Sequence, residues 1–190
     1  MLNSDYRRLC EIALPYAGRQ MYVHSFDLAD PKMAAGFEDY LETVRLLCHA
    51  AGAHVGIAHM TVDEKLVTAG MSQRRPKPHV DGCFMPPQST WGHPPSWAHG
   101  CNNVSGETIG RMAVIVASTM TGCRAWRGLF DAEPASDGDL SWLALSAGEV
   151  LERNVGYLLS PDCVHESMIQ VADVRRTFLR IALPLEFTFA

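Results

Sequence analysis

Two histidines and one aspartate are the residues of this chain whose types and spacing best fit metal chemistry. His79 and Asp81 lie two positions apart, within residues 77–82. Because alternate residues of an extended strand share a face, an imidazole and a carboxylate at this spacing can converge on one ion while Val80 points away. His165 is the best third ligand, on what should be a different strand. Two histidines and one carboxylate leave coordination positions open, which suits non-haem Fe(II) that binds a cosubstrate and O2 together.

Arginines near the carboxyl end, in a strand pattern that should belong to the core, supply a second chemical signal. Burying a guanidinium group is costly unless an anion meets it, and a dicarboxylate such as 2-oxoglutarate binds arginine through paired hydrogen bonds. Strand parity places Arg176 and Arg180 on one face, which looks inward if helices cover the other face. The alternative is an inward Arg175 acting with Thr177. We favour Arg176 as the cosubstrate ligand, with Arg180 as a second cofactor-binding candidate on the same face.

The segment between residues 82 and 106 is rich in proline, glycine and aromatic residues, which favours a lid-like loop over regular structure. Trp91 and Trp97 in this loop are candidate substrate contacts, although aromatic residues also pin loops onto a core. A separate zinc site could use three residues of the loop, but their spacing matches no familiar zinc pattern: His93, His99 and Cys101. Three basic residues just before His79 could attract an anionic substrate, although a solvent-exposed strand edge is the favoured interpretation: Arg74, Arg75 and Lys77.

The elements that must position these residues follow from hydrophobic spacing. Apolar residues at steps of three and four predict an amphipathic helix over Pro31–Gly52, and a shorter pattern predicts a helix over Leu9–Tyr16. Short β-rich runs follow, separated by turn signals such as Asp63-Glu64. The strands are expected at residues 54–62, 65–71, 111–118, 123–130, 140–145, 149–151, 156–159 and 176–183.

These elements predict a mainly β fold with N-terminal helices, in which a sheet sandwich or small barrel carries helices on one outer face. We expect one domain over residues 1–190, a length that can bury a continuous core. Residues 1–52 would form a helical support, and residues 53–190 the β-barrel core.

Composition narrows the classes of function. The chain has 47% hydrophobic and 19% charged residues, a formal net charge of -5 and scattered basic residues, so a small molecule or an amino-acid side chain is favoured over nucleic acid as substrate. The amino terminus lacks a signal-peptide layout and no apolar run reaches membrane-spanning length, which predicts a cytoplasmic protein without membrane contact. The six cysteines form no CxxC pair and are expected to be free thiols.

Taken together, the motifs resemble those of the Fe(II)/2-oxoglutarate-dependent oxygenase superfamily: an HxD pair at His79 and Asp81, a distal histidine at His165, and an arginine about ten residues later. The carboxyl-terminal arginines are similar to those of taurine-dioxygenase-like members, and the residues around His165 also resemble phytanoyl-hydroxylase-like and prolyl-hydroxylase-like members. The resemblance implies a double-stranded β-helix (jelly-roll, cupin-like) barrel. It also implies Fe(II), 2-oxoglutarate and O2 as cofactors, and hydroxylation or a related oxidation of a C–H bond with succinate and CO2 as co-products.

Two other classes compete with this hypothesis. A cupin-like metal enzyme that does not use 2-oxoglutarate would be expected to show HxH where this chain has His79 and Asp81, and it leaves the arginine-rich strand unexplained. A non-catalytic barrel could instead bind a ligand through the aromatic loop.

Overall fold

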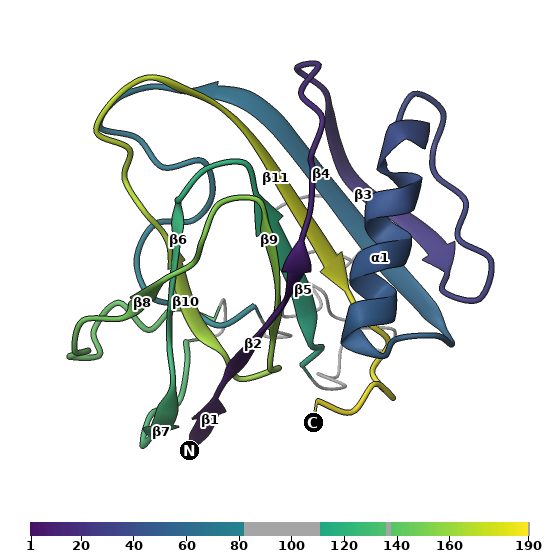
Figure 1. The fold of residues 1–190 in the computed structure, drawn as a ribbon. Helices are drawn as coiled ribbons and strands as arrows, with labels where there is room; N and C mark the ends of the chain where they lie inside the picture. The colour runs from purple at the N-terminus through teal and green to yellow at the C-terminus, as the bar shows by residue number, and fades with distance from the viewer. Residues whose placement is uncertain (82–110, 136–137, 190) are drawn as a thin grey trace.

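The chain folds mainly into antiparallel β-sheet, and the computed structural model describes residues 1–81, 111–135 and 138–189 (Figure 1). Within these ranges one α-helix, α1 (Leu41–Ala51), follows a short 3-10 helix, η1 (Glu38–Tyr40). The strands are β1 (Leu2–Ser4), β2 (Tyr6–Glu11), β3 (Gln20–Asp27), β4 (Ile57–Val67), β5 (Val114–Ser118), β6 (Cys123–Trp126), β7 (Gly128–Phe130), β8 (Glu149–Val150), β9 (Val155–Leu159), β10 (Val164–Ser167) and β11 (Val174–Ala182). The expected mainly β class is confirmed.

A six-stranded antiparallel sheet forms the larger layer, in the order β2-β9-β5-β11-β4-β3. Strand β11 lies inside this sheet, between β4 and β5. From Arg176 to Ala182 every residue of β11 is buried. The last strand is therefore an interior strand, and side chains on both of its faces are removed from water.

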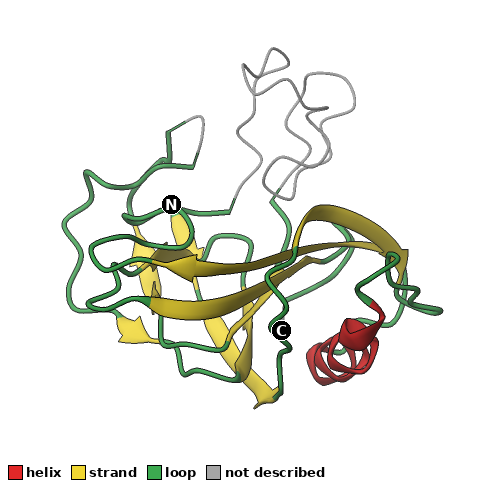
Figure 2. Cartoon of the chain, turned by 90° about the horizontal axis from the view of Figure 1, so that it is seen from above, coloured by secondary structure: helices red, strands yellow, loops and turns green. Residues whose placement is uncertain are grey.

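Helix α1 covers one face of the six-stranded sheet (Figures 1 and 2). Its buried residues recur every three or four positions and form one apolar stripe: Val44, Leu47, Cys48 and Ala51. They pack in a core cluster with Met60, Ile115 and Leu179 of the sheet. Gly52 ends the helix with φ 78°, a left-handed conformation that glycine adopts readily. Among the described residues, no helix combines the length and apolar character that a membrane span requires.

A three-stranded sheet, in the order β10-β6-β8, packs on the opposite face. A second apolar cluster joins the two sheets, with Val116 and Phe178 from the large sheet and Ala125 from β6. Because Val116 and Phe178 alternate with Ile115 and Leu179, which contact the α1 cluster, the second cluster lies on the other side of the large sheet. The space between the two sheets is where the candidate site forms.

The first 52 residues are less helical than the sequence suggests, because they also contribute β1, β2 and β3. The helix predicted over Leu9–Tyr16 is wrong: β2 ends at Glu11, and residues 12–16 have no regular structure. An apolar pattern this short fits the spacing of a helix and that of a strand. Here the segment up to Glu11 forms a strand because it pairs with β9. The helix predicted from Pro31 begins only at η1, because Gly36 has φ 83°, which no right-handed helix allows.

Two strand predictions also differ from the structure. The turn expected at Asp63-Glu64 is wrong, because β4 runs straight through both residues. The strand tolerates these buried carboxylates since each is paired, Asp63 with Lys65 at 3.1 Å and Glu64 with Arg19 at 2.9 Å. The strand expected at residues 140–145 is absent, and Leu140 packs instead in a third apolar cluster.

Candidate metal centre

His79 and His165 lie side by side on neighbouring backbone segments. The His79 N–H donates to the His165 carbonyl at 2.9 Å, and the His165 N–H donates to the His79 carbonyl at 2.9 Å. Residues paired in this way project their side chains from the same face, and the two ring centroids are 4.5 Å apart. Both side chains are buried. The pairing thus brings together two histidines that are far apart in sequence.

The Asp81 carboxylate completes a group of three donors. Its Oδ1 lies 4.0 Å from His79 Nε2 and 3.9 Å from His165 Nε2. One donor atom from each residue lies within 4.8 Å of the others, close enough for a single metal ion to contact all three. Val80 packs in the third apolar cluster, so the alternation expected of an extended segment holds here. The structure therefore brings the three predicted ligands together.

Backbone carbonyls orient both imidazoles. His79 Nδ1 lies 2.9 Å from the Lys77 carbonyl oxygen, and His165 Nδ1 lies 3.0 Å from the Cys163 carbonyl oxygen. An Nδ1–H that donates to a carbonyl leaves the lone pair on Nε2, the nitrogen that faces Asp81. Lys77 has φ 72°, an unfavourable conformation for a residue with a side chain. The strained residue is thus the one that presents its carbonyl to His79.

Burial keeps His79 uncharged. Removal from water and then the proximity of His165 lower the pKa of His79 to about 3, although Asp81 opposes this change. At neutral pH the imidazole is therefore neutral, which is the state that binds a metal.

Arg180 connects the metal site to β11. Its Nη1 donates to Asp81 Oδ2 at 3.1 Å, and its side chain is only 9% exposed. Arg180 thus bonds to one carboxylate oxygen of Asp81, whereas the other, Oδ1, lies 4.0 Å and 3.9 Å from the Nε2 atoms of the two histidines. Arg180 therefore helps to orient the aspartate. The Nε of Arg180 has no hydrogen-bond partner among the described residues.

Arg176 is the largest fully buried side chain of the described part of the chain. Its Nε donates to Ser118 Oγ at 2.7 Å and its Nη2 to Cys123 Sγ at 3.3 Å, whereas Nη1 has no partner within residues 1–81, 111–135 and 138–189. Arg175 is exposed, with its guanidinium 6.0 Å from the Tyr16 ring. The arginines that strand parity directs inward are therefore the buried ones.

A cavity of about 300 Å³ lies beside the three donors. Its wall comes from both sheets and includes the three candidate ligands together with Arg180. Arg176 lies one side chain away, behind Cys123, which does line the cavity. The volume is at the lower end of the roughly 300–1,000 Å³ of small-molecule sites.

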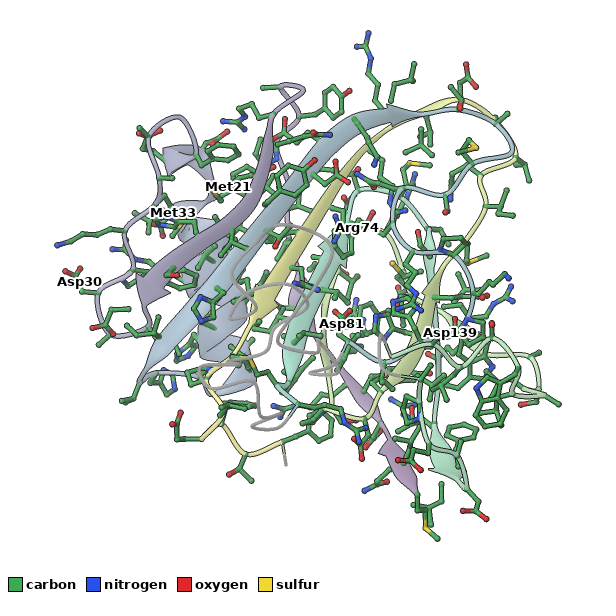
Figure 3. All side chains as sticks on the ribbon, turned by 180° about the vertical axis from the view of Figure 1, so that it is seen from behind. Met21, Asp30, Met33, Arg74, Asp81 and Asp139 are labelled. Carbon is green, nitrogen blue, oxygen red and sulfur yellow. The ribbon has the colours of Figure 1, made fainter. Side chains whose placement is uncertain are left out.

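Arg74 and Phe178 belong to the cavity wall. Sequence reasoning assigned no role to Phe178 and offered a substrate contact for Arg74 only as the less favoured alternative. The favoured interpretation of Arg74 as a solvent-exposed strand edge is wrong, since Arg74 lies in a bend outside the described strands and lines the cavity, with its guanidinium 5.6 Å from the centre of the Phe178 ring. Figure 3 shows Arg74 and Asp81 between β11 and β10. The cause is a long-range contact: the Arg74 N–H donates to Ser167 Oγ of β10 at 3.3 Å. The spacing of residues in one sequence contains no signal of that contact.

Several sequence-based hypotheses fall on residues that the structure does not describe. They concern the lid-like loop 82–106, the substrate contacts Trp91 and Trp97, and the alternative zinc ligands His93, His99 and Cys101.

Comparisons with known proteins do not assign the chain to a family. No family model and no curated protein matches the chain. Among solved structures it is similar to the crystal structure of AviO1 from Streptomyces viridochromogenes Tue57, with 14% identity and a TM-score of 0.39 over 96% of this chain and 76% of that one. A likeness at this level carries no argument about function, so the functional case stands on the site itself.

Proposed function

We propose that this chain is an Fe(II)- and 2-oxoglutarate-dependent dioxygenase that hydroxylates, or otherwise oxidises, a C–H bond of a small molecule or an amino-acid side chain. Succinate and CO2 are the co-products. One observation carries the proposal: two imidazoles and a carboxylate converge on the wall of a cavity that is flanked by buried guanidinium groups.

The donor set fits Fe(II). Two nitrogen donors and one oxygen donor form the set used by non-haem iron enzymes that keep coordination positions open for a cosubstrate and O2. His79 is neutral, both imidazoles have oriented Nδ1 atoms, and Arg180 orients Asp81. Such outer contacts are what a preformed metal site requires of its surroundings.

The buried arginines fit a dicarboxylate. Arg176 Nη1 and Arg180 Nε lack hydrogen-bond partners among the described residues, and a buried donor without a partner is costly. An anion from outside the chain would supply the missing acceptors. We assign the distal carboxylate of 2-oxoglutarate to Arg176, which requires the Cys123 thiol to turn aside, and the metal-binding end to the vicinity of Arg180.

Iron, 2-oxoglutarate and O2, when bound, supply the oxidising chemistry. The residues of the chain hold these groups and exclude water. Val116, Leu159 and Phe178 give the cavity an apolar wall on the side of the large sheet, so charged groups there interact more strongly than they would in water.

The course of the chain agrees with a double-stranded β-helix. Strands β4, β5, β9 and β11 belong to the large sheet, whereas β6, β8 and β10 form the small one, and His79 pairs with His165 of β10 through an isolated bridge. A chain that passes repeatedly between two facing antiparallel sheets has the winding of a jelly roll. We therefore propose this fold for the described residues.

The test is anaerobic titration of the protein with Fe(II) and 2-oxoglutarate. The proposal expects a weak visible charge-transfer band and, after admission of O2, conversion of 2-oxoglutarate to succinate. His79→Ala should abolish both. Arg176→Met should weaken 2-oxoglutarate binding roughly tenfold or more, because it removes charged hydrogen bonds, and should leave Fe(II) binding unchanged.

Arg175→Met is the matched control, since it removes a neighbouring but exposed arginine. Equal 2-oxoglutarate affinity in the two variants would contradict the assignment of Arg176. Metal binding without 2-oxoglutarate binding would instead favour a cupin-like enzyme, and no metal binding would favour a ligand-binding barrel.

A further inference from the structure

We propose that the substrate of this site carries an oxyanion, a carboxylate, sulfonate or phosphate group, and that Arg74 binds it. The inference rests on the proposed function, because it names the chemical class of the molecule that would be oxidised. It begins from the distribution of positive charge over the cavity wall.

Three arginines are among the described residues that line the cavity: Arg74, Arg75 and Arg180. Two of them have a carboxylate at hydrogen-bond distance. Arg180 donates to Asp81 at 3.1 Å, and Arg75 donates to Asp139 at 3.2 Å.

Arg74 is different, because among the described residues its ion pair is a long one, with Asp63 Oδ2 at 3.9 Å from Nη1. At that distance no good hydrogen bond forms. Asp63 already has closer partners, the Lys65 Nζ at 3.1 Å and the Gln20 amide at 3.0 Å. Of the three arginines on the cavity wall, Arg74 therefore has the weakest ion pair with a carboxylate of the described residues.

The position of Arg74 relative to the metal site is fixed by its backbone. The Arg74 N–H bonds to Ser167 Oγ at 3.3 Å, and the Arg74 carbonyl accepts a hydrogen bond from Ser72 Oγ at 2.8 Å. Ser167 lies two residues after His165 in β10, so both side chains leave the same face of that strand. An anion on Arg74 would consequently share the cavity with the metal ligands.

The electrostatics of the cavity favour a second anion. Burial, and then the nearby positive charge of Arg180, lower the pKa of Arg74, although the carboxylates of Asp81 and Asp63 oppose part of this change. Arginine stays protonated under any ordinary condition, so these two effects amount to an unfavourable charge that an anion would offset. In our assignment one carboxylate of 2-oxoglutarate binds Arg176 and the other binds near Arg180. Arg74 therefore remains available to bind the substrate.

The planar guanidinium group of Arg74 favours an oxyanion as its ligand. The guanidinium lies 5.6 Å from the centre of the Phe178 ring, and its planar fork matches carboxylate and phosphate groups. Because the cavity has a volume of about 300 Å³ and must also hold 2-oxoglutarate, the enclosed part of the substrate is small. The reacting carbon would then lie close to the anionic group.

The binding test uses the full chain loaded anaerobically with Fe(II) and 2-oxoglutarate, and titrates it calorimetrically with inorganic phosphate and with sulfate at constant ionic strength. Wild type should bind at least one of these saturably. Arg74→Gln should weaken that binding roughly tenfold or more, and Arg74→Lys should weaken it less, because charge remains while the planar fork is lost. The exposed-arginine control Arg175→Gln should match wild type.

A second arm distinguishes the sources of the oxyanion. Small carboxylates, sulfonates and phosphate monoesters would be compared for their stimulation of 2-oxoglutarate decarboxylation, with a neutral amide of each carbon skeleton as control. One oxyanion series should stimulate in wild type, and the stimulation should fall in Arg74→Gln.

Three results would overturn the inference: no anion binding by loaded wild type, equal anion affinity in Arg74→Gln, or a loss of 2-oxoglutarate affinity in Arg74→Gln as large as in Arg176→Met. The last result would make Arg74 a cosubstrate ligand. If the protein binds no Fe(II) or 2-oxoglutarate but still binds phosphate in a manner that depends on Arg74, the dioxygenase proposal fails and the oxyanion site stands.

Discussion

Replacing Gly122 with alanine should disable Arg176, the arginine proposed to bind 2-oxoglutarate, without removing it. A Cβ atom at Gly122 would lie 2.5 Å from Arg176 Cζ, 2.6 Å from Nη1 and 2.8 Å from Nη2. The guanidinium has little room to retreat, because it is fully buried and its Nε is bonded to Ser118. Overpacking of this kind costs about 1–3 kcal/mol, and loss of the charged hydrogen bond would cost about 1.5–3 kcal/mol. We expect stability to fall by about 1–3 kcal/mol and 2-oxoglutarate affinity to fall roughly tenfold or more.

The assay combines urea denaturation with anaerobic 2-oxoglutarate titration of the Fe(II) protein. Gly156→Ala is the matched control, because a Cβ there would collide with Leu47 in the cluster under α1. It should cost comparable stability and leave 2-oxoglutarate affinity unchanged. In an Arg176→Met background, Gly122→Ala should cause no further loss of affinity, since the interaction it disturbs is already absent. A folded Gly122→Ala protein with wild-type 2-oxoglutarate affinity would refute the role given to Arg176.

Two further predictions concern other charged contacts. Burial alone would raise the pKa of Glu64, but hydrogen bonds from backbone N–H groups, Tyr40 and Arg19 lower it to about 2. The resulting stabilisation, about 3 kcal/mol over the interval from the usual value of 4.5 to about 2, is present above pH 4.5 and is lost as pH falls toward 2. Glu64→Gln should flatten the acid-denaturation curve in that interval, and an unchanged curve would count against this account. Arg180→Met should weaken Fe(II) binding roughly 10-fold to 100-fold in competition titrations, because Asp81 loses the hydrogen bond that orients it; wild-type affinity would contradict it.

Short-range patterns in the sequence were sufficient for the parts of the site that depend on alternation. His79 and Asp81 share a face while Val80 packs on the other side, and Arg176 and Arg180 share one face of β11 while Arg175 lies on the other. Both results follow from the two-residue period of extended chain. They require no knowledge of which strands are neighbours.

Features that depend on pairing between distant segments were not predictable in this way. The contact of Arg74 with β10 and the passage of β4 through Asp63 and Glu64 both depend on partners elsewhere in the chain. A carboxylate pair is usually a turn signal, yet Glu64 is accommodated in a strand by an arginine 45 positions away. One conformational detail, the positive φ of Gly36, was enough to shorten the predicted helix.

The arginines carry more functional information than the histidine and aspartate pair. An HxD tripeptide can be an ordinary turn, and its convergence with His165 has significance only because the three donors meet in a cavity. A buried Arg176 is harder to explain by stability, since an apolar side chain of similar length would fill the same space without desolvating a charge. That the chain buries this cation and leaves one of its nitrogens without a partner in the described structure supports the proposal that an anion binds there from outside.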